Sequence, residues 1–217
     1  MELTPVQLRV LGCLVEKERT TPDNYPLTMN GLLSACNQTT NRWPVVTLTE
    51  ATVGNCIENL KSDGLLRVVY SRSNRADKYR HVLGEVWGLD EAELALLGVL
   101  MLRGAQTTAE LRARTERAHP FADMDEMGAV LARLATRPEP LVVHLGRSPG
   151  QKEPRWGHLL GGDPPPGSGP PVDEPPRSSR AERIDSLEAS VAGLRHEIER
   201  LRADHDSLAE RLSALLD

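Results

Sequence analysis

Residues 3–21, LTPVQLRVLGCLVEKERTT, recur in altered form at residues 89–107 as LDEAELALLGVLMLRGAQT. A shift of 86 positions, the difference between 89 and 3, aligns most of the leucines of the two segments. The same shift superimposes a Leu-Gly pair that ends at Gly12 in the first copy and at Gly98 in the second. Because this pair lies within a shared helical apolar pattern, the coincidence indicates an internal repeat.

Both copies open with a predicted capping box, Thr4 to Gln7 and Asp90 to Glu93. In this motif an oxygen side chain and a Glu or Gln three residues later satisfy the free amides at the start of a helix. Beyond the opening helix, each copy carries a short helix, a longer helix with a 3.6-residue apolar period, and two short strand-like runs. The clearest of these runs are residues 65–70 and 141–145, each followed by a turn-rich loop.

Three helices closed by a β-hairpin make a winged helix-turn-helix. We therefore expect a mainly α protein with small β-hairpins, of the α+β class, in which residues 1–84 and 85–160 are two tandem winged helix-turn-helix domains.

Residues 161–180 are rich in Pro and Gly and carry almost no apolar side chains, so they are predicted to be a flexible linker. Residues 181–217 have apolar residues alternately three and four positions apart, which predicts a coiled-coil helix. β-branched residues at position a with Leu at d favour a parallel homodimer, with His205 as the one polar residue in the seam. The alternative is that this helix folds back onto its own winged helices. The seam residues are Ile184, Leu187, Val191, Leu194, Ile198, Leu201, His205, Leu208, Leu212 and Leu215.

The total charge of −5 hides a difference between regions. Residues 1–84 carry ten Lys or Arg against eight Asp or Glu, and residues 85–160 carry nine against eleven. The first copy is therefore the mildly basic one, and part of its excess lies along the predicted wing, at Arg72, Arg75 and Lys78. A basic wing beside a recognition helix is the electrostatic pattern expected for contact with DNA phosphates.

The third helix of the first copy, predicted at residues 49–62, exposes Asn55, Asn59 and Lys61 between its apolar positions. Asn can form a bidentate pair with adenine, and Lys61 could reach phosphate or guanine. An ordinary solvated helix face is the alternative. The equivalent helix, residues 123–136, begins with several acidic residues and would be repelled by DNA. The second copy is better suited to a protein partner.

A loop at residues 35–45, ACNQTTNRWPV, has no counterpart in the second copy. This loop and several other segments resemble the YceH family of bacterial proteins over residues 1 to about 160. The resemblance implies a tandem winged-helix fold and no established biochemical activity. The other segments that carry it are residues 16–17, 21–28, 74–75, 78–79 and 102–107.

Two roles are open for the polar residues of this loop. Asn and Thr side chains often bond their own backbone, so the loop can be a hydrogen-bonded brace. Alternatively, it lies over a DNA groove and offers amides, hydroxyls and a guanidinium to phosphates and base edges. On the second interpretation, the loop residues that contact DNA are Asn37, Gln38, Thr40, Asn41 and Arg42.

The sequence carries no Gly-rich phosphate loop, nucleophile elbow or metalloprotease motif, so we expect a non-enzyme without cofactor or metal. Its three cysteines lack metal-ligand spacing and are expected to be small buried hydrophobes. With neither a signal peptide nor a long apolar run, a cytoplasmic location is expected, in the bacterial cytosol or nucleoid.

Two functions remain. The first is a transcription-factor-like protein that binds double-stranded DNA through its first winged helix. The second is a protein-interaction module resembling the tandem winged-helix subunits of chromosome-condensing complexes.

Overall fold

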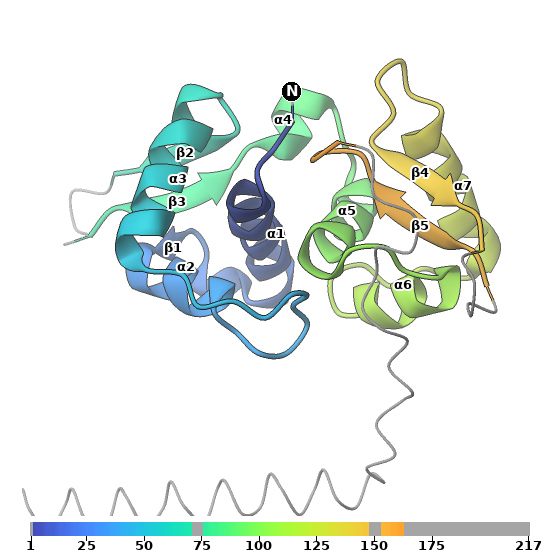
Figure 1. The fold of residues 1–217 in the computed structure, drawn as a ribbon, viewed down its shortest axis with the longest axis horizontal. Helices are drawn as coiled ribbons and strands as arrows, with labels where there is room; N and C mark the ends of the chain where they lie inside the picture. The colour runs from blue at the N-terminus through green and yellow to red at the C-terminus, as the bar shows by residue number, and fades with distance from the viewer. Residues whose placement is uncertain (1, 71–75, 148–152, 163–217) are drawn as a thin grey trace, which may run out of the picture. The chain divides into compact units, whose positions relative to one another are not determined.

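Two helices that are buried over much of their length, α1 (Pro5–Thr20) and α5 (Glu91–Arg103), pack against each other at the centre of the computed structural model (Figure 1). The structure describes residues 2–70, 76–147 and 153–162. In α1 every residue from Gln7 to Val15 is buried, and in α5 every residue from Ala92 to Leu102 except Val99. Because both helices are buried along these stretches, the other elements pack around this pair.

The elements follow the order that the repeat predicts, and the described chain belongs to the α+β class. In the first copy α1 is followed by η1 (Pro22–Asn24), β1 (Leu27–Thr28), α2 (Met29–Cys36), α3 (Glu50–Ser62), β2 (Leu66–Val69), β3 (Lys78–His81) and α4 (Leu83–Trp87). In the second copy α5 is followed by α6 (Thr108–Thr115), α7 (Met124–Ala135), β4 (Val142–Leu145) and β5 (Arg155–His158). Both predicted capping boxes are present, at Thr4 and at Asp90.

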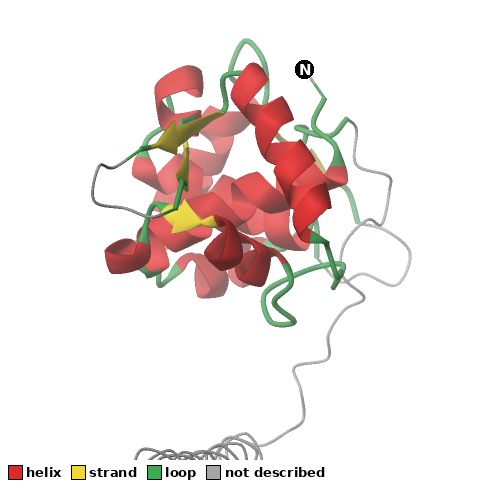
Figure 2. Cartoon of the chain, turned by 90° about the vertical axis from the view of Figure 1, so that its left-hand side faces the viewer, coloured by secondary structure: helices red, strands yellow, loops and turns green. Residues whose placement is uncertain are grey.

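The strands are short and lie at the edges of the helical core, as Figure 2 shows from the side of the first copy. β2 and β1 pair antiparallel with the two sides of β3, and Leu27 of β1 faces Tyr79 of β3. β4 pairs antiparallel with β5, where the repeat places Trp156 at the position of Tyr79. Trp156 exchanges two backbone hydrogen bonds with Gln106, at 2.7 and 2.9 Å. Gln106 therefore takes the place in the second copy that Leu27 takes in the first.

Elements missing from the prediction are η1, β1 and α4. The expected boundary between residues 84 and 85 falls inside α4. The predicted linker begins at the end of the described chain, and the coiled coil, residues 181–217, lies outside the described residues.

The aligned glycines of the two copies lie where α1 and α5 are in close contact. A Cβ added to Gly98 would lie 2.8 Å from Cγ1 of Val15. A Cβ added to Gly12 would lie 2.8 Å from Cγ of Leu102 and 3.2 Å from Cβ of Met101. Since Val15 and Met101 are also 86 positions apart, the two contacts are equivalent. Each helix leaves out a side chain where the other helix inserts one.

The ends of the copies meet in an equally matched way. A Cβ on Gly84, at the end of the first copy, would approach the carbonyl oxygen of Leu89 at 3.3 Å. A Cβ on Gly161, at the end of the second copy, would approach the carbonyl oxygen of Leu3 at 3.1 Å. The amide of Leu3 also donates to the carbonyl of Leu160 at 2.7 Å. The first residues of the chain are thereby attached to the last described ones, and the two copies form one compact unit.

The close approach predicts a stability difference between two glycine variants. Gly98→Ala gains helix propensity of about 1 kcal/mol but forces a methyl group into the stiff, buried Val15, and overpacking costs about 1–3 kcal/mol. We expect a net loss of about 1 kcal/mol in the free energy of unfolding, measured by urea titration. In the control, Gly128→Ala in α7, the added Cβ meets no atom within 4 Å, and a gain of about 0.5–1 kcal/mol is expected. Equal stabilisation by both substitutions would show that the helices do not need a glycine at this contact.

Candidate functional site

α3 has one buried face and one polar, exposed face. Val53, Cys56, Ile57 and Leu60 enter the core, and the hydroxyl of Thr49 caps the helix by accepting a hydrogen bond from the amide of Thr52 at 3.2 Å. The three residues of α3 that are predicted to contact DNA, Asn55, Asn59 and Lys61, are all exposed. Lys61 donates to the carboxylate of Glu58 at 3.3 Å, on the surface.

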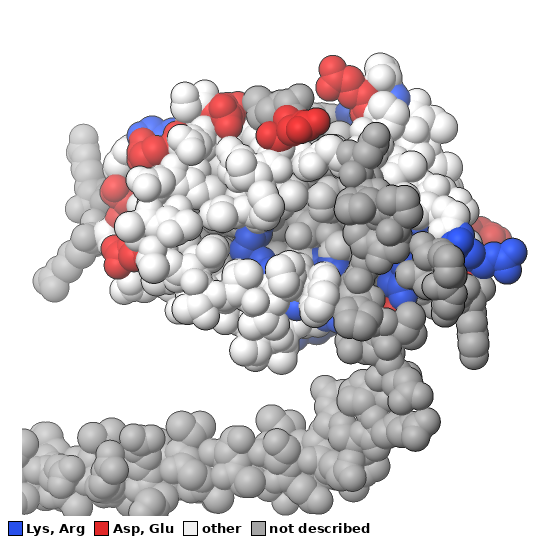
Figure 3. Space-filling model, in the orientation of Figure 1, with Lys and Arg blue, Asp and Glu red and all other residues white. Residues whose placement is uncertain are grey.

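The hairpin beside α3 offers fewer unpaired cations than its sequence suggests. Lys78, in β3, is partly exposed. Arg67 and Arg80 both bind the carboxylate of Glu85, at 3.0 and 2.8 Å. The predicted wing residues Arg72 and Arg75 lie outside the described residues. On the face shown in Figure 3, the Lys and Arg side chains are scattered, with no broad basic patch on the left, where α3 lies.

Asn37 closes the loop between α2 and α3. Its side-chain oxygen accepts a hydrogen bond from the amide of Leu48 at 2.7 Å, and its side-chain nitrogen donates to the carbonyl of Leu48 at 3.0 Å. An amide side chain that pairs with both backbone groups of one residue acts like a neighbouring strand. This pair brings residues 37 and 48 together directly before the cap of α3.

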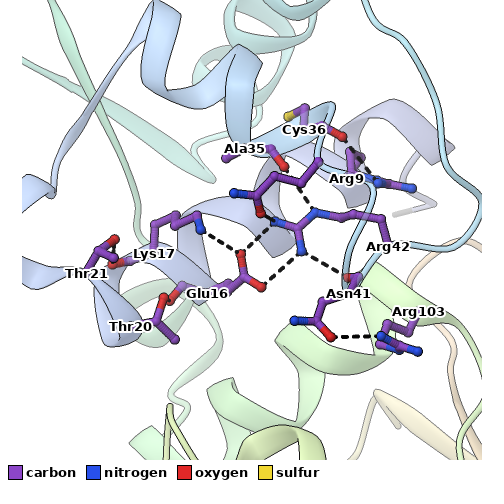
Figure 4. Close-up of polar contacts among 11 residues, drawn as sticks. Arg9, Glu16, Lys17, Thr20, Thr21, Ala35, Cys36, Asn41, Arg42 and Arg103 are labelled. Atoms are coloured by element: carbon purple, nitrogen blue, oxygen red, sulfur yellow. Dashed lines mark hydrogen bonds and ion pairs between the residues drawn. The ribbon is translucent and has the colours of Figure 1, made fainter. Parts of the chain in front are cut away.

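Arg42 lies inside the loop, with none of its side-chain surface exposed (Figure 4). Its guanidinium makes a bidentate pair with Glu16 of α1, with N···O distances of 3.0 and 2.6 Å. It also donates to the carbonyls of Ala35 and Asn41, at 3.1 and 2.9 Å, and to the side-chain oxygen of Gln38 at 2.9 Å. Such a saturated, charge-assisted network holds the loop and the end of α2 against α1.

The electrostatics of this pair favour both charged forms. Burial alone would raise the pKa of the Glu16 carboxyl, but the hydrogen bonds and the charge of Arg42 outweigh burial and lower it below its ordinary value. Burial alone would lower the pKa of Arg42, and the carboxylate of Glu16 reverses that effect and raises it. Removing either partner leaves the other as an uncompensated charge.

The tip of the loop contacts the second copy. The backbone of Asn41 is left-handed, with φ of 57°, and its side-chain oxygen accepts a hydrogen bond from Arg103 of α5 at 2.9 Å (Figure 4). The amide of Trp43 donates to the carbonyl of Leu102 at 2.8 Å, while the side chain of Trp43 is 43% exposed. The loop thus links three helices of the first copy to α5.

The structure separates the predicted site residues into two groups. Asn37, Gln38 and Arg42 form hydrogen bonds within the protein that hold the loop together. These three residues fit the first of the two roles considered for the loop, a hydrogen-bonded brace. Thr40 and Asn41 are exposed on the loop. Sequence reasoning missed Glu16, because nothing local to α1 indicates that its carboxylate would bind an arginine 26 positions away. The one sequence feature that could have pointed to Glu16 is that residues 16–17 are among the segments that resemble the YceH family.

The three cysteines lie in the interior of the protein. All three cysteines are free and buried, as expected, and burial raises the pKa of Cys56 to about 11, so its thiol is protonated at neutral pH. Within residues 2–70, 76–147 and 153–162 no three His, Cys, Asp or Glu side chains are grouped as metal ligands. Across the same described ranges, no helix is both long and apolar enough to span a bilayer.

Comparison with known proteins shows strong similarity over most of the chain. The family model described as "Protein of unknown function, DUF480" matches residues 3–151. A UPF0502 protein of Geobacter sulfurreducens is 47% identical over 198 residues, covering 88% of this chain and 90% of the relative. The UPF0502 protein YceH of Salmonella newport is 44% identical over 216 residues, covering 93% and 97%. The resemblance to the YceH family is confirmed.

The buried ion pair predicts a pH-dependent effect of Glu16→Gln. At pH 7 this substitution leaves Arg42 without its charge partner and is expected to cost about 3 kcal/mol in the free energy of unfolding. Because the folded pKa of Glu16 lies below its unfolded value of about 4.3, its charge stabilises the protein above that pH, and the stabilisation is lost as pH falls through the folded pKa. The difference between wild type and variant should therefore shrink below about pH 4.

The control makes the same chemical change at the surface. Glu58→Gln removes the exposed pair with Lys61 and should cost much less than Glu16→Gln, because water screens a surface pair. Urea titrations at several pH values measure all three proteins. A cost for Glu16→Gln no larger than that for Glu58→Gln, or one independent of pH, would contradict the role given to this pair.

Proposed function

Because this chain belongs to DUF480, a family of unknown function, we propose a function from its own residues: a non-enzymatic, transcription-factor-like protein that binds double-stranded DNA. In this proposal each copy is a winged helix-turn-helix, and the first copy contacts DNA. The observation that carries the proposal is the exposed polar face of α3, held beside a β-hairpin by the preceding loop.

α3 has the side chains that base contact requires. Asn55 and Asn59 are four positions apart, so they lie one above the other on the same exposed face. Asn pairs with the N6 and N7 atoms of adenine in the major groove, which is wide enough to admit a helix. Lys61 is also exposed, on a neighbouring part of the helix surface, and its ammonium group is suited to phosphate or guanine. Its pair with Glu58 is exposed, and such pairs contribute little, so DNA can replace it.

Phosphate contact would come from few residues. Arg42 is buried, and Arg67 and Arg80 both bind Glu85, so we assign none of these three arginines to phosphates. The cations that we assign to phosphates are Lys61 and Lys78, together with Arg72 and Arg75, which lie outside the described residues. About four phosphate contacts would give a slope of roughly −3.6 in log affinity against log salt. We therefore expect the protein to bind DNA weakly and in a salt-sensitive way. The Asn side chains of α3 would add a preference for particular base sequences.

The second candidate function is a protein-interaction module, and the surface of α7 favours it. The first turn of α7 carries Asp125 and Glu126, and Met124 beside them is 39% exposed. Asp123 caps the helix by accepting hydrogen bonds from two amides of that turn. The carboxylates of this turn repel DNA and would attract basic side chains of a protein partner. The exposed methionine would contact apolar side chains of the same partner.

The DNA-binding proposal predicts different effects for two kinds of variant, measured by fluorescence anisotropy at about 50 mM salt, where the electrostatic contribution is strong. Lys61→Gln with Lys78→Gln should weaken binding to every duplex and reduce the salt slope by about 2. Asn55→Ala with Asn59→Ala should change the preference among sequences, because these side chains face base edges. The control Arg147→Gln alters an exposed residue that follows β4 in the second copy and should leave both properties unchanged. The absence of duplex binding by the wild type, with a protein partner lost on Met124→Lys, would replace this function by the second candidate.

We also propose a cytoplasmic homodimer formed by the heptad of residues 184–215, which lies outside the described residues. Leu194→Lys with Leu201→Lys would bury like charges in the seam and should give monomers in sedimentation experiments. An unchanged mass would place the dimer contact elsewhere or show that the terminal helix folds back on its own chain.

A further inference from the structure

A cavity of about 400 Å³ lies between the two copies. The first copy contributes the start of α1, a residue before it and part of the segment that leads into α3. The second copy contributes a residue near the end of α5, the two residues that follow this helix, the end of β5 and the last described residues. The volume is in the range of pockets that hold small molecules.

Most of the cavity lining is apolar. Among the described residues that line it, two side chains are titratable, Arg9 and His158. Ligand sites usually have this form, in which an apolar wall surrounds a few polar groups that fix the orientation of the ligand. The two titratable side chains therefore indicate which polar group a ligand would carry. The apolar lining residues include Leu3, Val6, Leu8, Val46, Leu48 and Met101.

His158 occupies the position in the second copy that His81 occupies in the first. Each is the last residue of the second strand of its hairpin, and the residue after each donates its amide to the carbonyl that precedes the first strand, at 2.9 and 3.0 Å. Nε2 of His81 lies 2.9 Å from a carboxylate oxygen of Glu18, and its Nδ1 accepts a hydrogen bond from the amide of Leu83 at 3.3 Å. Nδ1 of His158, in contrast, is buried without a hydrogen-bond partner.

The carboxylate that binds His81 has no counterpart in the second copy. Glu18 lies near the end of α1, and the shift of 86 positions places Gly104 at the equivalent point, directly after α5. Gly104 lines the cavity together with His158, and a Cβ added to this glycine would meet no atom within 4 Å. The second copy therefore has open space where the first copy has a carboxylate beside its histidine.

Arg9 brings a buried positive charge to the same cavity. It is 5% exposed, and it donates hydrogen bonds to the carbonyl of Cys36, at 3.3 Å, and to that of Pro44 (Figure 4). Pro44 also lines the cavity. Within the described part of the chain no carboxylate pairs with Arg9, and a buried charge is costly without an opposite charge. The repeat has Ala95 at the equivalent position of α5, so the shared helix pattern does not itself require a cation here.

We propose that this cavity binds a small organic acid, whose carboxylate takes the place beside His158 that Glu18 takes beside His81. Arg9 would donate to this carboxylate and compensate its charge. Nδ1 of His158 can donate as well, because a neutral imidazole carries one N–H. The apolar lining would contact the hydrocarbon part of the acid.

The charge of the cavity suits one carboxylate better than a phosphate dianion. Burial lowers the pKa of His158 to about 4, so its ring is neutral at pH 7. Arg9 is then the single cation among the described lining residues. The site is separate from the exposed face of α3, and the proposal does not depend on DNA binding.

Isothermal titration calorimetry on the full chain tests the proposal with two probes of similar length, sodium octanoate and 1-octanol. We expect octanoate to bind saturably with one-to-one stoichiometry, and 1-octanol to bind at least about tenfold more weakly, because it lacks the charge. Arg9→Gln should weaken octanoate binding about tenfold and reduce the difference between the two probes. His158→Phe keeps a ring of similar size and should weaken octanoate binding about threefold, because the Nδ1 donor is lost.

Matched variants show whether the acid binds in this cavity. Val46→Phe would fill part of the cavity and should weaken octanoate binding about tenfold, whereas Val45→Phe alters the neighbouring residue, which is 53% exposed and outside the lining, and should change it less than about twofold. Arg67→Gln removes an exposed charge outside the cavity and should also change it less than about twofold. Circular dichroism checks that each variant is folded. If Arg9→Gln does not fold, the two probes and the two valine variants still decide the question.

Three results would overturn the proposal. The folded wild type could fail to bind octanoate. It could bind 1-octanol as tightly as octanoate, which would show an apolar cavity that does not recognise a carboxylate. Val45→Phe could weaken octanoate binding as much as Val46→Phe, which would place the bound acid elsewhere. Failure of α3 to bind DNA would leave all these readouts unaffected.

Discussion

The close approach of α1 and α5 at Gly12 and Gly98 is the constraint on which the rest of the structure depends. Each glycine makes room for a side chain of the other helix, Met101 and Leu102 at Gly12 and Val15 at Gly98. A side chain at either position would separate two helices that are buried on nearly every face. Because the same pair of residues recurs 86 positions apart, duplication of one sequence supplied both halves of the contact. The two copies consequently share one core.

The loop between α2 and α3 is the main departure from this symmetry, and the candidate functions depend on it. Its buried arginine holds it to α1, its asparagine at position 37 closes it before α3, and its tip contacts α5. A hydrogen-bonded brace and a functional surface are therefore compatible in one loop. The inward side chains fix its path, while Thr40 and Asn41 are exposed.

Much of the fold could be predicted from sequence because local signals specify it. The capping boxes at Thr4 and Asp90 and the apolar periods gave the order of the main elements. The two-residue strand β1 and the bridge at Gln106 carry too little pattern to detect, since each depends on pairing with a strand about 50 residues away. The site was less predictable. The composition of the loop marked Arg42 as a candidate contact to DNA, but its burial follows from Glu16, a partner that becomes adjacent only after folding.

Native-state hydrogen exchange of the amides in α1 and α5 tests most directly whether the glycine contact unites the two copies. If the two helices share one core, their slowest amides should open only in global unfolding and give the same free energy of opening. They should also respond equally to added denaturant, although α1 and α5 belong to different copies. A free energy of opening that is clearly lower for one helix than for the other would show two copies that unfold separately, and would contradict the account.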